Sequence, residues 1–136
     1  MSAEIGFEVQ LNIPYDDALE MTKAELMAEG FGIMTSIDVK AIMKEKLDVE
    51  FRPYTILGAC NPPLAHRAIT QDAVAGLLLP CNVTVEAAGS TASIVRIANP
   101  ETILGAGSLN SDPEINAVGK EARMRLERVA EALLSS

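Results

Sequence analysis

The sequence contains no tryptophan, one histidine and two cysteines in 136 residues, and only 4% of its residues are aromatic. Apolar residues nevertheless make up 49% of the chain, so a core would be built mainly from Ile, Leu, Val, Met and Ala. This apolar content excludes intrinsic disorder, because enough surface can be buried to offset the entropy of the chain. The length suits one domain that spans residues 1–136.

Long hydrophobic runs and basic patches are also absent. No run approaches the roughly 20 apolar residues that a membrane-spanning helix needs, so we expect no membrane partner. The chain is acidic, with a net charge of -8 and scattered Lys and Arg residues, which disfavours binding to nucleic acid. Residues 1–4 do not begin an export signal, so we expect a cytoplasmic protein with reduced cysteines.

The pattern of apolar residues predicts five strands. Apolar and polar residues alternate over 5–13 and 31–36, which is typical of strands with one buried face. Residues 54–60 are apolar on both faces, so this strand is predicted to be central. Residues 77–86 and 91–98 are predicted to form a hairpin, in which Pro80 marks an edge, a bulge or a break.

Helices are predicted over 15–29, about 38–47, 61–72 and 111–133, where apolar residues recur at steps of three and four. Gly30 is a natural C-terminal cap for the first. The runs 61–63 and 111–114 are helix starts, because proline is tolerated in the first helical turn. Residues 99–110 are predicted to be irregular apart from one helical turn at Glu101 to Leu104. The predicted order is βαβαβαββα, which indicates an α+β fold with a single sheet and helices packed on it.

Two similar Cys-Asn segments are the candidate ligand-binding site. Cys60 and Asn61 lie where a strand gives way to a helix that also carries His66, and Cys81 and Asn82 lie in a later strand. If the helix start faces the Cys60 sulfur, its amides and dipole would lower the pKa of the thiol. If apolar packing dominates, that pKa would rise instead.

Structural explanations compete with this one. Free cysteine is among the most buried residue types, and Cys81 shares the inward register of its strand. Asn61 can cap a helix and Asn82 can be an outward polar residue. Cys60, His66 and Cys81 are one candidate metal set, because thiolate and imidazole suit zinc or copper. His66 falls outside the buried arc of its helix, which favours a surface histidine, and neither a metal nor a cofactor is assigned.

Three segments resemble the family called domain of unknown function 302. They are Gly30 to Val39 with Thr35, Ile37 and Asp38; the run from Ile56 to Ala65 through Cys60 and Asn61; and the run from Leu77 to Val83 through Cys81 and Asn82. The resemblance covers nearly the whole chain and implies a small, mostly prokaryotic α+β protein that forms homodimers. It implies no activity, substrate or cofactor.

These observations predict a cytoplasmic homodimer that binds a small ligand or metal near the two Cys-Asn segments. The dimer is expected because a chain of this size buries a limited fraction of its surface and symmetric dimers are the commonest assembly. An alternative is a thiol-dependent enzyme or redox protein that uses Cys60. A purely structural or interaction domain is the third hypothesis, and whether any reaction is catalysed stays open.

Overall fold

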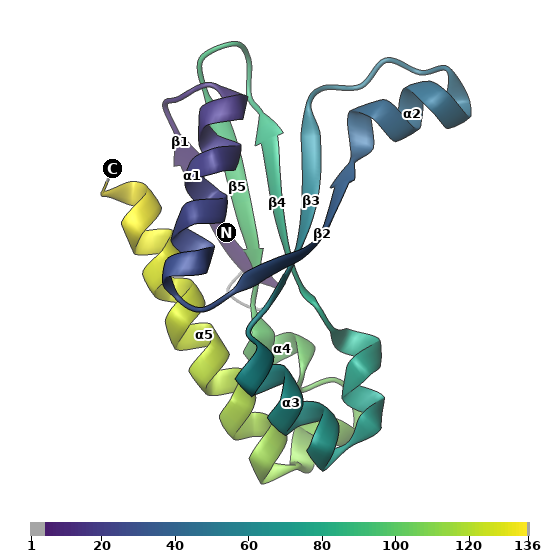
Figure 1. Cartoon of the computed structure of the whole chain (residues 1–136), viewed down its shortest axis with the longest axis vertical. Coiled ribbons are helices and arrows are strands. Elements are labelled where there is room, and N and C mark those ends of the chain that lie inside the picture. Colours follow the sequence, from purple (N-terminus) through teal and green to yellow (C-terminus); the bar gives the residue numbers. More distant parts are fainter. Residues whose placement is uncertain (1–4, 136) are drawn as a thin grey trace.

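A computed structural model describes residues 5–135, and an antiparallel five-stranded sheet forms its centre (Figure 1). Residues 1–4, from which the sequence predicts the absence of an export signal, lie outside the described residues. The strands lie in the order β1-β5-β4-β3-β2 and are β1 (Gly6–Leu11), β2 (Gly32–Asp38), β3 (Tyr54–Cys60), β4 (Cys81–Ala87) and β5 (Ser93–Ala98). Strand β3 lies inside the sheet, which confirms the prediction from its two apolar faces.

The helices lie between and after the strands, and only part of them covers one face of the sheet (Figure 1). They are α1 (Tyr15–Ala28), α2 (Val39–Leu47), α3 (Pro62–Gln71), α4 (Pro100–Ile103) and α5 (Pro113–Leu134), with 3-10 helices η1 (Ala73–Leu78) and η2 (Gly107–Ser111). Helix α1 contacts β4 and β5, α5 contacts β1 and α1, and α3 packs on α5. The fold is therefore α+β, as predicted. Helix α4 agrees with the single helical turn predicted at Glu101 to Leu104, whereas η1 and η2 add short helical segments to the predicted order.

The core lies between this sheet face and helices α1, α3 and α5. Alternate residues of β1, β3, β4 and β5 point into it, which is the expected result of period-two patterning. The buried face predicted for the strand over 31–36 is wrong, because β2 is an edge strand and none of its residues is buried. The fully enclosed strand residues come from the three central strands and include Leu57, Ala59, Val83, Val85, Val95 and Ile97. Helix α5 supplies the apolar stripe that its three- and four-residue spacing predicted: Ile115, Val118, Ala122, Leu126, Val129 and Leu133.

Capping side chains set the helix starts near the candidate site. The Asn61 Oδ1 atom accepts a hydrogen bond from the Leu64 amide at 3.2 Å, at the start of α3. Asp112 does the same for α5, and its Oδ1 lies 2.9 Å from the Glu114 amide. Gly30 follows α1 with a φ of 86°, a left-handed conformation that suits glycine. These starts and this stop agree with the sequence predictions.

The predicted strand over 77–86 is wrong in its first part, because strand β4 begins only at Cys81. Residues 73–78 instead form η1, whose first turn is capped by the Asp72 side chain. Leu77 is 84% exposed, so it does not belong to an inward-facing strand pattern. Pro80 has no amide to contribute to a strand ladder, which explains why pairing starts after it. The break that Pro80 predicted is confirmed.

Helix α2 stands away from the other helices at the end of β2 (Figure 1). None of its residues is buried, although Ile42 and Leu47 are apolar and are 41% and 64% exposed. Within residues 5–135, the structure has no helix of the length and apolar character that crossing a membrane would need.

Candidate functional site

Both cysteines line one small cavity at the junction of β3, β4, α3 and α5. Cys81 lies opposite Ala59 in the β3–β4 pairing, and Cys60 is the next residue along β3. Neither cysteine is in a disulfide. The cavity has a volume of about 20 Å³, and both cysteines and Asn61 contribute to its lining. The structure thus brings together three of the five residues that the sequence singled out.

The remaining walls of this two-cysteine pocket are apolar. Helix α3 contributes Leu64, Ala65 and Ala68, and α5 contributes Val118 and Ala122. Because α3 starts directly after the Asn61 cap, its first turns lie beside the end of β3 and bring the small side chains of Ala65 and Ala68 to the pocket. Phe31, Leu79 and Leu104 complete the lining from other parts of the chain.

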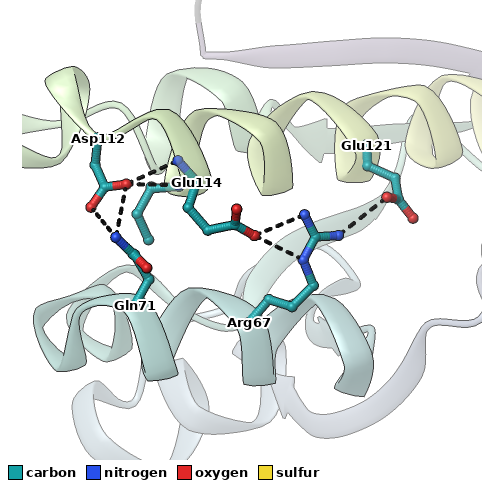
Figure 2. Close-up of polar contacts among 6 residues, drawn as sticks. Arg67, Gln71, Asp112, Glu114 and Glu121 are labelled. Carbon is teal, nitrogen blue, oxygen red and sulfur yellow. Dashed lines mark hydrogen bonds and ion pairs between the residues drawn. The ribbon is translucent and has the colours of Figure 1, made fainter.

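Polar contacts hold the two helices together outside the pocket (Figure 2). The Arg67 guanidinium donates to Glu114 Oε1 through Nη2 at 3.0 Å and to Glu121 Oε1 through Nη1 at 3.4 Å. One turn further along α3, Gln71 Nε2 lies 3.1 Å from Asp112 Oδ2. All these acceptors belong to α5 or its cap, so these contacts help to set the distance between the two helical walls.

Burial keeps both thiols protonated at neutral pH. It raises the pKa of Cys60, and it raises the pKa of Cys81 to about 11, with a smaller contribution from the Cys60 charge. The helix start does not reverse this effect, and the amide of Leu64 is already taken by the Asn61 cap. A nucleophilic cysteine needs a lowered pKa, so this environment argues against the thiol-dependent enzyme that uses Cys60.

The other two predicted site residues lie elsewhere. His66 is an exposed residue of α3 and does not line the pocket. Asn82 points to the opposite sheet face, where it lines a separate groove with Thr84 and Tyr54. Its neighbour Cys81 points inward, because successive strand residues alternate between faces. The two Cys-Asn segments are therefore similar in sequence but not in their geometry.

The candidate metal set of Cys60, His66 and Cys81 is not assembled. Within residues 5–135, no three or more His, Cys, Asp or Glu side chains are grouped so that they could hold a metal ion.

Sequence reasoning did not identify the walls that α5 and the 99–112 segment contribute. Val118 and Ala122 do stand out in the sequence, because they belong to the apolar stripe of the last helix. The stripe indicates that these residues are buried but not which residues they meet. Leu104 lies in a segment that was predicted to be largely irregular, and it is only 3% exposed.

Comparisons with known proteins agree with the fold. The chain resembles the crystal structure of an uncharacterized conserved protein DUF302 from Bacillus stearothermophilus, with a TM-score of 0.80 and 24% identity over 93% of this chain and 95% of that one. At this identity the likeness shows the fold alone. No curated protein matches. The model of the domain of unknown function DUF302 matches residues 7–133, so the chain belongs to this family.

Proposed function

We propose that this chain is a cytoplasmic homodimer that binds a small ligand or metal in the two-cysteine pocket. One observation carries the binding proposal: Cys60 and Cys81, which are not bridged, both contribute to the lining of a single apolar cavity, although they come from different strands. Buried free cysteines alone would be ordinary core residues. At this cavity the inward-facing Cys81 supplies a soft, polarizable sulfur in an otherwise apolar wall, and Cys60 and Asn61 also contribute to the lining.

The volume of the pocket limits its ligand. Sites for metabolites and cofactors have volumes of about 300–1,000 Å³, whereas this cavity holds about 20 Å³. A single water needs roughly 10–15 Å³ measured in this way. The pocket therefore suits a guest of one atom or a few atoms.

A pocket-filling variant tests the proposal. Ala65→Leu adds a branched side chain to the lining without changing either thiol, and Ala24→Leu makes the same change at an exposed position of α1. Xenon serves as an apolar guest of one atom, and silver(I) serves as a soft ion. We expect at least one probe to bind the wild type and the Ala24→Leu control, measured by native mass spectrometry and thermal shift, and to lose binding in Ala65→Leu.

Two results would overturn the binding proposal. One is that neither xenon nor silver(I) binds the wild type. The other is equal binding by wild type and Ala65→Leu, since a guest that ignores the filled pocket lies somewhere else. Circular dichroism of Ala65→Leu checks that loss of binding does not reflect loss of the fold, and Ala68→Val offers a smaller change in the same wall.

Helix α2 supports the homodimer. Isolated helices shorter than about 12–15 residues are marginal in water, yet α2 has 9 residues and buries none of them. The exposed apolar side chains Met34, Ile37, Ile42, Leu47 and Val49 all lie in β2, in α2 or directly after it. Burial of such a surface against a partner would supply the missing stabilisation.

A second copy of this chain is the partner that we propose, because symmetric dimers are the commonest assembly. Charge does not select the partner, since Lys44 pairs with Asp48 at 2.9 Å and with Glu50 at 3.3 Å, directly after α2 in the same chain.

Substitution in α2 tests this assembly. We expect sedimentation and light scattering to show a dimer for the wild type and a monomer for Ile42→Glu or Leu47→Glu, because a carboxylate would be desolvated in the interface. Leu77→Glu changes an apolar residue of η1 that is even more exposed, and η1 lies at the other end of the molecule (Figure 1), so this variant should stay dimeric. A monomeric wild type at high concentration would refute the proposal, and so would a dimer that ignores both α2 changes.

A further inference from the structure

We propose that a groove on the outer face of the sheet binds an uncharged, planar heterocyclic molecule with hydrogen-bonding groups along one edge. The outer face is the sheet face that points away from the core. Strands β1, β3, β4 and β5 and helix α4 all contribute to its groove, and the lining includes Tyr54, Asn82, Thr84 and Ala98. Neither cysteine lines this outer groove, so it is a second site, separate from the two-cysteine pocket.

The floor of the outer groove is low and flat. Val83 lies opposite Ile97 in the β4–β5 pairing and both are buried in the core, so their neighbours Asn82 and Ala98 point to the outer face. Gly6 lies opposite Ala98 in the β1–β5 pairing. Glycine has no side chain and alanine has only a methyl group, so a flat molecule can lie close to the backbone at this level of the sheet.

The size of the outer groove suits an organic molecule. Its volume of about 480 Å³ lies within the range of about 300–1,000 Å³ that is typical of small-molecule sites. Apolar side chains such as Ile5, Ala98 and Ile103 form much of the lining. A planar ring system can bury the apolar surface of its faces against such a lining.

Three polar side chains of the outer groove have unused hydrogen-bonding capacity. The Tyr54 hydroxyl and the Asn82 side-chain amide make no hydrogen bond to another residue within 5–135. Thr84 Oγ1 is buried and also has no partner in this part of the chain. Buried polar atoms are nearly always paired, so the Thr84 hydroxyl indicates a partner that is not part of the fold. Hydroxyl and amide groups can both donate and accept, which fits the adjacent N–H and C=O groups of a heterocycle edge.

The charged groups of this face already neutralise one another. Arg96 donates to Glu86 at 2.5 Å and to Glu8 at 2.9 Å. Arg52 donates to the other oxygen of Glu86 at 2.6 Å. An anionic ligand would have to displace a carboxylate from Arg96, and a cationic ligand would have to displace an arginine from Glu86. Charge complementarity therefore favours an uncharged molecule.

Titration with planar probes tests the ligand class, with the chemical shifts of the backbone amides as the readout. The neutral heterocycles are 2-quinolone and lumichrome. Naphthalene is planar but has no polar edge, and quinoline-2-carboxylate adds a negative charge. We expect at least one neutral heterocycle to bind once per chain and to shift the amides of residues 82–84 and 96–98. It should bind roughly tenfold more tightly than naphthalene or the carboxylate, because only a neutral polar edge can form the unused hydrogen bonds.

Variants of the groove locate the bound probe. Ala98→Leu fills the floor and should abolish binding, whereas Ala24→Leu makes the same change at an exposed position of α1 and should bind like the wild type. Tyr54→Phe and Thr84→Val each remove one hydroxyl with little change in shape, and each should weaken binding roughly three- to tenfold. Because the Thr84 hydroxyl has no partner within 5–135, Thr84→Val should not lower the melting temperature of the free protein. These two variants decide the question even if Ala98→Leu does not fold.

Four results would overturn this proposal. They are failure of both neutral heterocycles to bind, equal binding of naphthalene or of the carboxylate, unchanged binding by a folded Ala98→Leu variant, and unchanged binding by both hydroxyl variants. Ala65→Leu, which fills the two-cysteine pocket, should bind these probes like the wild type. If Ala65→Leu instead loses them and Ala98→Leu keeps them, the outer groove is refuted while the two-cysteine pocket is supported.

Discussion

The enclosure of Cys81 predicts an unreactive thiol, and this can be tested directly. Cys81 is more deeply enclosed than Cys60, and burial raises its pKa from an ordinary value of 9.0 to about 11. In the Cys60→Ser variant Cys81 is the sole thiol of the chain, so alkylation reports on it alone. The substitution also removes the smaller contribution of the Cys60 charge and leaves burial as the cause of the raised pKa.

The magnitude follows from the thiolate fraction, because the thiolate is the species that reacts. A rise from 9.0 to about 11 lowers that fraction about 100-fold at neutral pH. We therefore expect iodoacetamide to alkylate Cys81 in the folded Cys60→Ser variant at least about 100-fold more slowly than a free cysteine peptide. Alkylation should accelerate with pH up to about pH 11, and the rate can be followed by intact-protein mass spectrometry.

The same pKa implies an alkaline loss of stability. Below the unfolded pKa the thiol is neutral in both states, so burial costs nothing there. Between about pH 9 and pH 11 the unfolded chain releases the proton while the folded chain keeps it, so stability falls as pH rises. The loss from this group is about 3 kcal/mol at most, measured as the difference in urea unfolding between the wild type and Cys81→Ala.

Two results would refute this reasoning. Alkylation of folded Cys81 at the rate of the free peptide at about pH 8 would show that the sulfur is accessible and its pKa ordinary. Identical alkaline stability profiles for the wild type and Cys81→Ala would show that burial does not favour the neutral thiol.

Glu86 is 4% exposed, and although its burial alone would raise its pKa, hydrogen bonds from Arg96 and Arg52 outweigh it and lower the pKa. The stabilisation that the Glu86 carboxylate provides should therefore be present above about pH 4.5 and be lost as pH falls through the lowered pKa. Acid unfolding of Glu86→Gln should lack this loss of stability at low pH, and an acid unfolding profile equal to that of the wild type would contradict the prediction. Gly58→Ala should cost about 1–3 kcal/mol in urea unfolding, because the new Cβ would clash with Thr35 Oγ1 and would lie 2.8 Å from Pro80 Cγ; a neutral change would show that both neighbours move aside. Arg67→Ala should cost at most about 1 kcal/mol and less in high salt, since the side chain is 40% exposed; a larger thermal shift would mean that its contacts to α5 dominate the helix spacing.

The sequence predicted well where the controlling interactions are local. The start of α3 at Asn61 follows from a cap, two prolines and the next turn of the helix. The interior position of β3 follows from its apolar residues on both faces. The predicted strand over 77–80 is wrong because its apolar alternation resembles a strand, while the Asp72 cap and Pro80 favour η1 and a late start of β4.

The sequence by itself determined the α+β class, most of the strands and helices, and the presence of two cysteines beside asparagines. Each of these depends on residues within about one helical turn or on alternation along one strand. Only the tertiary structure decided that Cys60, Asn61 and Cys81 share a pocket while His66 and Asn82 lie apart. That outcome depends on the pairing of β3 with β4 and on α5 packing across α3, contacts between segments more than 20 residues apart. Periodicity indicates that a residue faces inward, but packing between distant elements decides what it faces.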